Sequence, residues 1–232
     1  MSIGKVSLVG VGPGDPELLT RKADRVLREA DVVYHPGRDH NSGFAIRIVR
    51  SLLPPRTELR AAAVEMSEAG DRYEKLAAEL AAEALAGRRV AFITEGDPLV
   101  YSTASRLLAI LKTTWPNVPV EIVPGVSSLT AAAAAAGQSL VQAEETLVVI
   151  PACHHVEDLE RLIEQHDRVA LVKVGSVFSQ IISLLKRRVC VNRAVFLEKV
   201  GTAEERVLTD VESVDPQTIS YFSIVLIDRK NP

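Results

Sequence analysis

The first half of the chain alternates between two hydrophobic patterns. Short apolar runs indicate strands buried on both faces, and the stretches between them repeat apolar residues at helical spacing, as Leu19, Ala23, Val26 and Leu27 do. The pattern predicts strands at 5–9, 31–34, 89–94 and 120–123 and helices at 17–29, 45–53, 73–86, 100–114 and 127–136. Strands that alternate with helices favour a largely parallel sheet covered on both faces.

Residues typical of helix ends support these bounds. Asp15 is a candidate N-cap, because Pro16 follows it and proline is common in the first turn of a helix. Asp71, with Glu74 three positions later, fits a capping box. Gly87 is typical of a helix end. The polar stretch 35–43 predicts a loop after the second strand.

The pattern changes after residue 124. The predicted strands there are 146–150, 169–174, 194–198, 206–209 and 221–227, with helices at 156–165 and 178–186. The last strands follow one another without an intervening helix, which favours a mixed or antiparallel sheet. We therefore expect an α/β protein of two domains, 1–124 with a mostly parallel sheet and 125–232 with a mixed sheet.

Composition narrows the class of protein without indicating a reaction. The 232 residues are 47% hydrophobic and 4% aromatic, and 27 Lys and Arg against 30 Asp and Glu give a net charge of −3. These values argue against a disordered chain and a nucleic-acid-binding surface, and no apolar run approaches the ~20 residues of a membrane span. The N-terminus leads directly into a strand, and Cys153 and Cys190 are too few for a disulfide framework, so we expect a cytoplasmic protein.

Glycine and proline cluster in three short segments, each between a predicted strand and a predicted helix. The segments are GVGPGDP at 10–16, GDP at 96–98 and PG at 124–125. Open parallel sheets bind ligands at the carboxyl ends of their strands, where glycine allows tight turns and close backbone approach. Three such segments in one sheet indicate a binding cleft.

The first segment does not fit a dinucleotide site. Its spacing is G-x-G-x-G-D rather than G-x-G-x-x-G, and Pro13 removes an amide donor from the loop. The Asp15 carboxylate also occupies the helix start where a pyrophosphate would bind. These features disfavour a nucleotide-binding oxidoreductase.

Polar side chains accompany the other two segments. Asp97 follows a strand end, where a carboxylate can receive ribose hydroxyls or act as a base. Ser102 and Thr103 open one predicted helix, and Ser127 and Ser128 open another. Helix capping is the structural alternative for these residues.

The three segments together resemble the tetrapyrrole methylase family, whose members transfer methyl groups from S-adenosylmethionine to cobalamin and sirohaem precursors. The resemblance is carried by GVGPGDPELLT at 10–20, EGDPLVYST at 95–103 and VPGVSSLTAAAA at 123–134, and it covers essentially the whole chain. The last two segments, with YFSIVL at 221–226, are most similar to the members that methylate precorrin-2 at carbon 20.

The resemblance implies a two-domain homodimer that binds S-adenosylmethionine in the cleft between its domains. Two groups of cofactor contacts are implied, one in the three segments and one in the second domain. The implied residues are Pro13, Gly96, Asp97, Ser102, Thr103, Ser127 and Ser128, and then Val172 and Phe222 with their neighbours Lys173 and Ser223.

The expected reaction is an in-line methyl transfer to a carbon of an electron-rich tetrapyrrole. Such a reaction needs alignment more than a strong base, and it requires neither a catalytic triad nor a metal. Asp97 or Glu95 is the candidate to accept the proton that carbon 20 loses, with water as the alternative acceptor.

A substrate with eight carboxylates requires a local basic patch on this acidic chain. Arg38 and Arg47 are the candidates, with Arg106 as a further one, and His35 is a candidate substrate contact or proton acceptor. Arginine suits this role because its planar guanidinium pairs with carboxylates in a bidentate manner. For any single one of these arginines, the pattern favours the alternative, a solvated surface residue.

Two further questions stay open in the sequence. The adjacent Cys153, His154 and His155 predict a loop rather than a metal site, because neighbouring side chains diverge in extended chain. The alternatives to the expected function are methylation of another tetrapyrrole, such as uroporphyrinogen III or precorrin-4, and a non-catalytic module that binds nucleotides or tetrapyrroles. The motifs do not separate metal-free precorrin-2 from its cobalt complex.

Overall fold

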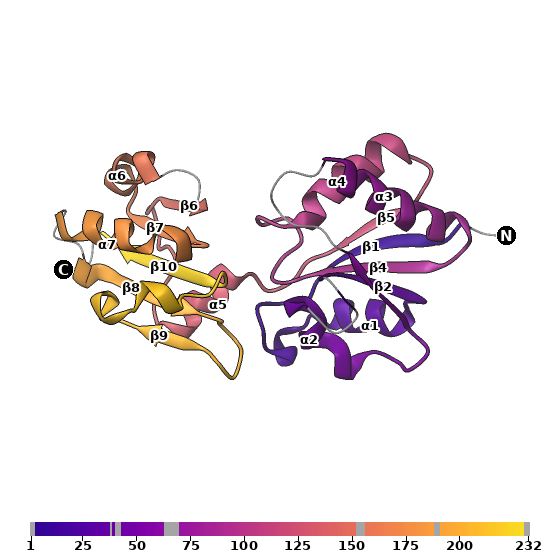
Figure 1. Cartoon of the computed structure of the whole chain (residues 1–232), viewed down its shortest axis with the longest axis horizontal. Coiled ribbons are helices and arrows are strands. Elements are labelled where there is room, and N and C mark those ends of the chain that lie inside the picture. Colours follow the sequence, from indigo (N-terminus) through magenta and orange to yellow (C-terminus); the bar gives the residue numbers. More distant parts are fainter. Residues whose placement is uncertain are drawn as a thin grey trace. The chain divides into compact units, whose positions relative to one another are not determined.

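The computed structural model divides into two compact units, Met1–Ser127 (unit 1) and Ser128–Pro232 (unit 2), shown in Figure 1. The structure describes residues 3–37, 39, 43–62, 70–151, 156–187 and 191–229. Within these ranges, no helix combines the length and the apolar character that crossing a membrane requires.

Unit 1 contains a five-stranded sheet in which every pair of neighbouring strands is parallel. Its order is β3-β2-β4-β1-β5. The strands are β1 (Lys5–Gly10), β2 (Val32–Pro36), β3 (Glu58–Ala62), β4 (Arg89–Thr94) and β5 (Val120–Val123). The parallel sheet that the alternating pattern predicts is confirmed.

Helices cover both faces of this sheet (Figure 1). The helices α1 (Arg21–Glu29) and α2 (Phe44–Val49) pack on one face, and α3 (Gly70–Leu85) and α4 (Thr103–Thr114) pack on the other. Successive residues of β1 therefore enter different cores, Leu8 with α3 and α4 and Val9 with α1 and α2. Burial on both faces is the reason why Val6, Leu8 and Val9 are apolar without regard to the face on which they lie.

Several bounds differ from the sequence prediction. The expected helix 17–29 begins only at Arg21, because the Thr20 side chain accepts a hydrogen bond from the Ala23 N–H and caps a new helix there. Asp15 caps a separate 3₁₀ turn, η1 (Pro16–Leu18). The predicted Asp71 cap is also wrong, since Asp71 lies within α3.

Three further bounds follow from local capping and pairing. The expected helix 100–114 starts at Thr103, with Ser102 as its N-cap. The expected helix 45–53 is α2 followed by a 3₁₀ turn, η2 (Arg50–Leu52). His35 belongs to β2 rather than to a loop, because β3, which the sequence pattern missed, extends the pairing of β2 to its end.

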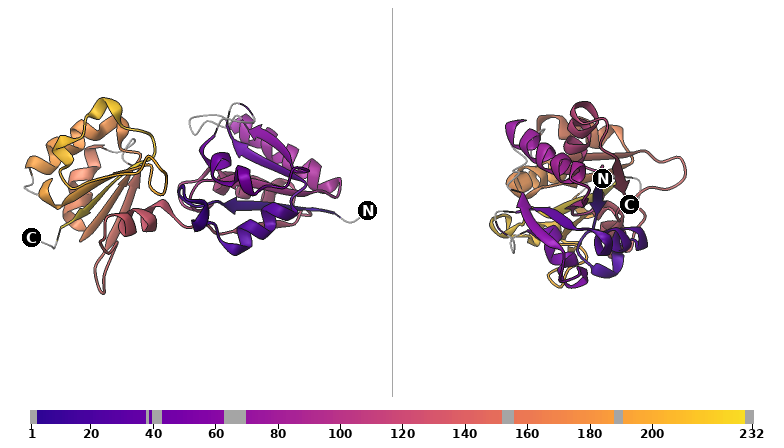
Figure 2. Two further views of the ribbon diagram at one scale, coloured as in Figure 1. Left: turned by 90° about the horizontal axis from the view of Figure 1, so that it is seen from below. Right: turned by 90° about the vertical axis from the view of Figure 1, so that its right-hand side faces the viewer.

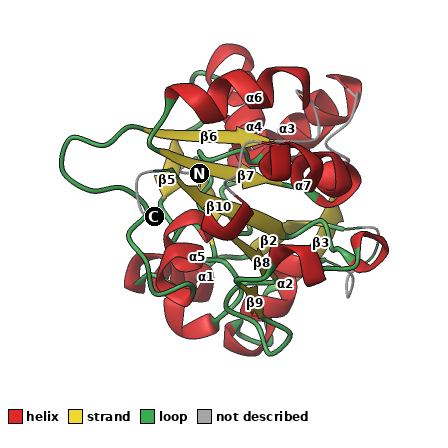
Figure 3. Cartoon of the chain, turned by 90° about the vertical axis from the view of Figure 1, so that its left-hand side faces the viewer, coloured by secondary structure: helices red, strands yellow, loops and turns green. Residues whose placement is uncertain are grey.

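Unit 2 contains a five-stranded mixed sheet. Its strands lie in the order β6-β7-β10-β8-β9, as Figure 3 shows. They are β6 (Leu147–Pro151), β7 (Arg168–Val172), β8 (Ala194–Glu198), β9 (Arg206–Leu208) and β10 (Ser223–Asp228). Among the described strands of this sheet, β6 and β7 pair in parallel, whereas β10 is antiparallel to β7 and β8, and β9 is antiparallel to β8. The expected mixed sheet is confirmed.

The helices of unit 2 complete its layers. The core beside the sheet contains apolar residues of α6 (Val156–Gln165) and α7 (Phe178–Arg187). The alanine-rich α5 (Ser128–Ala135) contacts β10 and buries Leu129 and Ala132. The segment between α5 and β6 extends away from the sheet of unit 2 (Figure 2), and it exposes Val141.

Candidate functional site

The three glycine-containing segments meet at one edge of the unit 1 sheet. The strands β4, β1 and β5 are adjacent and parallel, so their carboxyl ends lie at the same edge. A Cβ atom on Gly10 would lie 2.5 Å from the Gly96 carbonyl oxygen and 2.8 Å from the Gly125 nitrogen. The three backbones thus approach so closely that only glycine fits at Gly10.

A short backbone bridge joins the first two segments. The Gly96 N–H donates to the Gly12 carbonyl oxygen at 2.7 Å, and the Gly12 N–H donates to the Gly96 carbonyl oxygen at 3.3 Å. Gly12 and Gly96 have positive φ angles, +80° and +65°, which residues other than glycine rarely adopt. The bridge fixes the loop after β1 against the loop after β4.

The Asp97 carboxylate joins the second and third segments. One oxygen, Oδ2, accepts a hydrogen bond from the Gly125 N–H at 3.1 Å, and the other, Oδ1, accepts one from the Leu99 N–H at 2.9 Å. Each carboxylate oxygen has a further lone pair, so these bonds leave acceptor capacity for a ligand. Asp97 is thus first of all a residue that positions backbone at this edge.

The neighbouring hydroxyl groups have structural contacts of their own. The Ser102 Oγ accepts a hydrogen bond from the Ala104 N–H at 3.1 Å and lies 3.0 Å from the Thr94 Oγ1. Thr103 is buried at the first position of α4. Ser127 and Ser128 are half-buried where α5 begins. The capping alternative therefore holds for Ser102.

Pro13 lies in the turn between β1 and η1, and its side chain is buried. Gly96 is also buried, and Glu95 is half-buried beside it. By contrast, Leu99, Val100 and Tyr101 are all exposed by more than two fifths, at 51%, 41% and 45%. This edge of unit 1 therefore presents an apolar surface next to its tightly packed backbone.

A second group of predicted residues gathers at one edge of the unit 2 sheet. The Lys173 N–H, after β7, donates to the Ser223 carbonyl oxygen at 2.9 Å, and the Lys199 N–H, after β8, donates to the Phe222 carbonyl oxygen at 2.9 Å. Both lysines have positive φ angles, +60° and +50°. The start of β10 is thus held between the ends of its two neighbours, with the buried Val172 as the last residue of β7.

Ser223 is buried at this edge, with 1% of its surface exposed, and its hydroxyl oxygen has no hydrogen-bond partner among the described residues. The neighbouring Glu198 carboxylate is also buried, but it accepts hydrogen bonds from the Ser220 N–H and from Arg206. A buried polar group without a partner is costly in a folded protein, so the Ser223 hydroxyl is a natural point of contact for a ligand.

The predicted substrate-binding residues that the structure describes lie on different elements. His35 is fully buried within β2, with Nδ1 lying 3.2 Å from the Pro36 carbonyl oxygen. Arg47 is exposed on α2, and its guanidinium lies 5.5 Å from the centre of the Phe44 ring. Arg106, on α4, lies 4.8 Å from the centre of the Tyr73 ring. Arg47 and Arg106 come from helices that cover different faces of the sheet.

Some of the residues singled out in the sequence lie outside the described residues. They are Arg38, Cys153, His154, His155 and Cys190. Among the residues that are described, no group of three His, Cys, Asp or Glu side chains is placed to hold a metal ion.

Sequence reasoning missed a basic group on α1. Arg21, Lys22, Arg25 and Arg28 are all exposed on this helix. The signal in the sequence is the spacing of Arg21, Arg25 and Arg28, because residues at i, i+4 and i+7 share one face of a helix.

Comparison with known proteins identifies the family. The family model described as Tetrapyrrole (Corrin/Porphyrin) Methylases matches residues 5–215. The chain belongs to this family. The resemblance carried by the three segments is therefore confirmed, and a tetrapyrrole methylase is a methyltransferase, not an oxidoreductase.

Relatives within the tetrapyrrole methylases match nearly the whole chain. The cobalt-precorrin-2 C(20)-methyltransferase of Salmonella typhimurium is 34% identical, over 98% of this chain and 97% of the relative. The precorrin-2 C(20)-methyltransferase of a Sinorhizobium species is 31% identical, over 98% and 96%. The crystal structure of uroporphyrin-III C-methyl transferase from Thermus thermophilus, complexed with S-adenyl homocysteine, superposes with a TM-score of 0.70 at 26% identity, over 97% and 98%.

Proposed function

We propose that this protein is an S-adenosylmethionine-dependent methyltransferase that methylates precorrin-2, or its cobalt complex, at ring carbon 20 in cobalamin biosynthesis. The observation that carries the proposal is the similarity to two precorrin-2 C(20)-methyltransferases, which extends over 98% of the chain in each case. One of these relatives is named for the cobalt substrate and the other for the metal-free one, so both substrates are included.

The residues of both sheet edges fit S-adenosylmethionine, which supplies an electrophilic methyl group on a sulfonium when bound. In unit 1, glycines that leave no room for a Cβ atom bring backbone amides and carbonyls to the edge. In unit 2, the Ser223 hydroxyl is buried and has no partner among the described residues. A related solved structure holds S-adenyl homocysteine, the product form of this cofactor.

Each predicted cofactor residue receives a role in this proposal. Asp97 positions Gly125 and Leu99 and offers its remaining lone pairs to hydroxyl groups of the cofactor. Gly96 and Pro13 shape the backbone on which the cofactor lies. The other proposed contacts are Ser102, Thr103, Ser127 and Ser128 in the first group, and the backbone of Val172 and Phe222 in the second.

The chemistry that these residues support is alignment. Transfer of the methyl group requires the attacking carbon to lie opposite the departing sulfur, and holding that geometry supplies ~7–11 kcal/mol in favourable cases. Both Asp97 oxygens accept backbone hydrogen bonds. Asp97 is therefore proposed as a positioning residue that also accepts the proton lost from carbon 20, with water as the alternative acceptor.

The proposed substrate contacts are His35, Arg38 and Arg47. Arg47 is exposed, with its guanidinium over the Phe44 ring, so a carboxylate can reach it. His35 is fully buried, so its proposed role requires the end of β2 to open or the contact to be made through the backbone at Pro36. Arg38 lies between them in the chain.

We also propose that the protein acts in the cytoplasm as a homodimer. The residue that supports dimerisation is Val141, an exposed apolar side chain on the segment that extends away from unit 2 (Figure 2). Light scattering on the native protein and on Val141→Asp tests this part. The native protein is expected to have twice the mass of one chain, and the variant is expected to shift toward the mass of one chain.

The decisive experiment is a transfer assay. The native protein is incubated with methyl-labelled S-adenosylmethionine and, in parallel, with precorrin-2, cobalt-precorrin-2 or uroporphyrinogen III, and the product is analysed by NMR. Label at carbon 20 of either precorrin-2 form is expected. Transfer to uroporphyrinogen III alone, or to another carbon, would contradict the proposed substrate. Absence of transfer from a protein that binds S-adenosylhomocysteine would favour a non-catalytic module.

A further inference from the structure

One face of α1 carries a concentration of positive charge. Arg21, Arg25 and Arg28 share this face, and neither Arg21 nor Arg25 forms an ion pair with any residue that the structure describes. Arg28 is paired with Asp24, with its Nε lying 2.8 Å from a carboxylate oxygen. Lys22 is paired with Glu121 at 2.7 Å. Two guanidinium groups therefore remain available for an anion.

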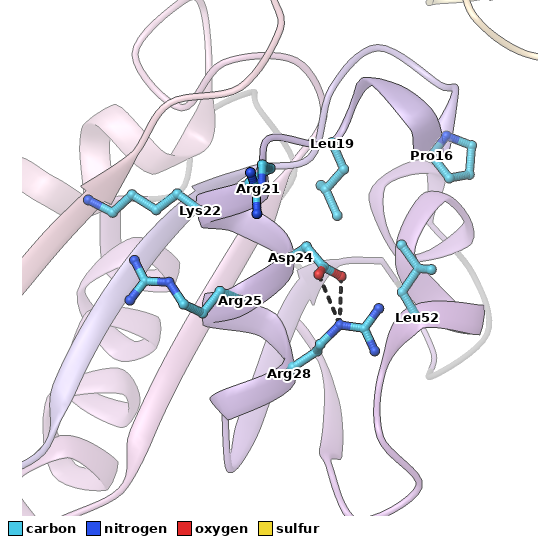
Figure 4. Close-up of a pocket in the computed structure, with 8 residues that line it drawn as sticks. All are labelled: Pro16, Leu19, Arg21, Lys22, Asp24, Arg25, Arg28 and Leu52. Atoms are coloured by element: carbon cyan, nitrogen blue, oxygen red, sulfur yellow. Dashed lines mark hydrogen bonds and ion pairs between the residues drawn. The ribbon is translucent and has the colours of Figure 1, made fainter.

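These side chains line a pocket with a volume of about 650 Å³ (Figure 4). Sites for small molecules have volumes of ~300–1,000 Å³, so this pocket holds a small molecule or part of a larger one. Its apolar wall is formed by Pro16, Leu19 and Leu52. In Figure 4, Arg25 and Lys22 extend toward one side of α1 and Arg28 toward the other, so the charges are spread rather than focused on one point.

The pocket adjoins the sheet edge that carries the proposed cofactor residues. Pro16 opens η1, which directly follows the first glycine-containing segment. The Thr20 hydroxyl, at the cap of α1, lies 3.4 Å from the carbonyl oxygen of Pro124 in the third segment. The Lys22–Glu121 ion pair attaches the first turn of α1 to β5. The first turn of α1, which carries Arg21, is thus fixed beside this edge.

We propose that this pocket binds peripheral carboxylates of the tetrapyrrole substrate and captures it for the transfer site, an inference that rests on the proposed function. From Arg21 to Arg25 the helix rises by about 6 Å, so the two unpaired guanidinium groups suit an anion that carries more than one charged group over such a length. A tetrapyrrole with carboxylates around its rim has this property, whereas a single phosphate does not. Arginine pairs with each carboxylate through two parallel hydrogen bonds.

Capture of this kind has a defined kinetic signature. Removal of exposed charges slows the encounter of a polyanion with the protein and weakens its binding, but leaves the aligned reaction unchanged. The effect decreases as salt is added, because exposed charges are screened over about 8–10 Å at ~0.1–0.15 M ionic strength. KM and its salt dependence therefore report on the pocket, and kcat does not.

The test compares Arg21→Gln/Arg25→Gln with the control Arg72→Gln/Lys75→Gln. Arg72 and Lys75 are exposed on α3, which covers the other face of the sheet, so the control removes the same net charge elsewhere. For each protein, KM and kcat are measured with precorrin-2 over a range of salt concentrations. The dissociation constant of uroporphyrin III, a stable octacarboxylate porphyrin, is measured by fluorescence with and without pyrophosphate as competitor.

The α1 variant is expected to raise KM and the porphyrin dissociation constant about three- to tenfold at low salt, with kcat changed less than about twofold. The control is expected to change neither. Equal effects of both variants would show that binding depends only on the net charge of the protein, and would overturn the proposal. Displacement of the porphyrin by pyrophosphate at comparable affinity would overturn it in favour of a phosphate site.

The two proposals fail in different ways. If the native protein methylates precorrin-2 and the α1 variant retains native KM and porphyrin affinity, the pocket is not a capture site and the proposed function stands. If the native protein methylates no precorrin, yet porphyrin binding depends on Arg21 and Arg25, the proposed function fails and the polycarboxylate site stands.

Discussion

The Asp97 carboxylate accepts a hydrogen bond from the backbone N–H of Gly125 at 3.1 Å, so one side chain ties the loop after β4 to the loop after β5. The two residues are separated by 28 positions in the chain. The same carboxylate fixes the Leu99 N–H. Asp97 therefore fixes two of the three segments that form the proposed cofactor surface in unit 1.

Replacement of Asp97 by Ala is expected to weaken the binding of S-adenosylhomocysteine about tenfold or more. The substitution leaves two backbone donors without acceptors, at a cost of about 1–3 kcal/mol each where water cannot replace the carboxylate. Asp97→Asn keeps one acceptor oxygen, so an intermediate affinity is expected. Calorimetry measures the affinity. Native affinity in Asp97→Ala would show that Asp97 does not belong to the cofactor site.

Replacement of Gly10 or Gly125 by Ala is expected to destabilise unit 1 and abolish cofactor binding. The added Cβ atom on Gly10 meets backbone of Gly96 and Gly125, and backbone cannot rotate away as a side chain does. The control is Gly175→Ala, whose Cβ atom would find its nearest neighbour at 3.4 Å, an ordinary contact. Thermal unfolding and calorimetry are the measurements. Native stability in Gly10→Ala would show that the segments separate without cost.

Ser223→Ala is expected to weaken cofactor binding without lowering the stability of the fold. Removal of a buried hydroxyl that has no described partner leaves the free energy of unfolding unchanged or raises it by up to about 1 kcal/mol. If the hydroxyl contacts the cofactor, the affinity for S-adenosylhomocysteine falls in the same variant. Urea unfolding and calorimetry measure the two effects. Unchanged affinity would contradict the proposed contact near Phe222.

Acid is expected to weaken unit 1 through Glu121. Hydrogen bonds from Lys22 and Lys5 hold the pKa of this carboxyl below its ordinary value of 4.5. A group with a lowered pKa in the folded protein stabilises it above the unfolded pKa, and this stability is lost as the pH falls through the folded pKa. Glu121→Gln is therefore expected to be less stable than the native protein at pH 6.

The difference between Glu121→Gln and the native protein is expected to shrink as the pH falls below 4.5, and to disappear below the lowered pKa of the folded carboxyl, where the native carboxyl is protonated too. Urea unfolding at several pH values provides the measurement. Glu74→Gln is the control, because Glu74 is exposed on α3 and forms no ion pair with a described residue. A pH-independent difference would show that the ion pairs do not stabilise the fold.

The elements that the sequence predicted well are those whose residues decide them locally. The strands 89–94, 120–123 and 194–198 and the helix 156–165 agree in both bounds with β4, β5, β8 and α6. β3 was missed because it is an edge strand with only one buried residue, Ala62, so its apolar signal is weak. Its position depends on pairing with β2, which is 26 residues away in the chain.

The candidate site likewise has parts that the sequence located and parts that it missed. The sequence located the three glycine-containing segments, because a strand, a glycine and a helix start are local features. It left Asp97 and Ser102 between capping and ligand contact, and the structure supplies the partners that show both in positioning roles. The basic pocket was missed because Pro16 and Leu52 come together only through the packing of η1, α1 and η2.

The sequence by itself determined the family, the two kinds of sheet and the residues at the strand ends, because hydrophobic periodicity and glycine spacing are properties of neighbouring residues. The tertiary structure alone decided that β4, β1 and β5 are adjacent, that Asp97 bonds to Gly125, and that the first turn of α1 lies beside the same sheet edge. The physical reason is that strand order and side-chain contacts between distant segments are set by packing in three dimensions, which no local pattern of residues encodes.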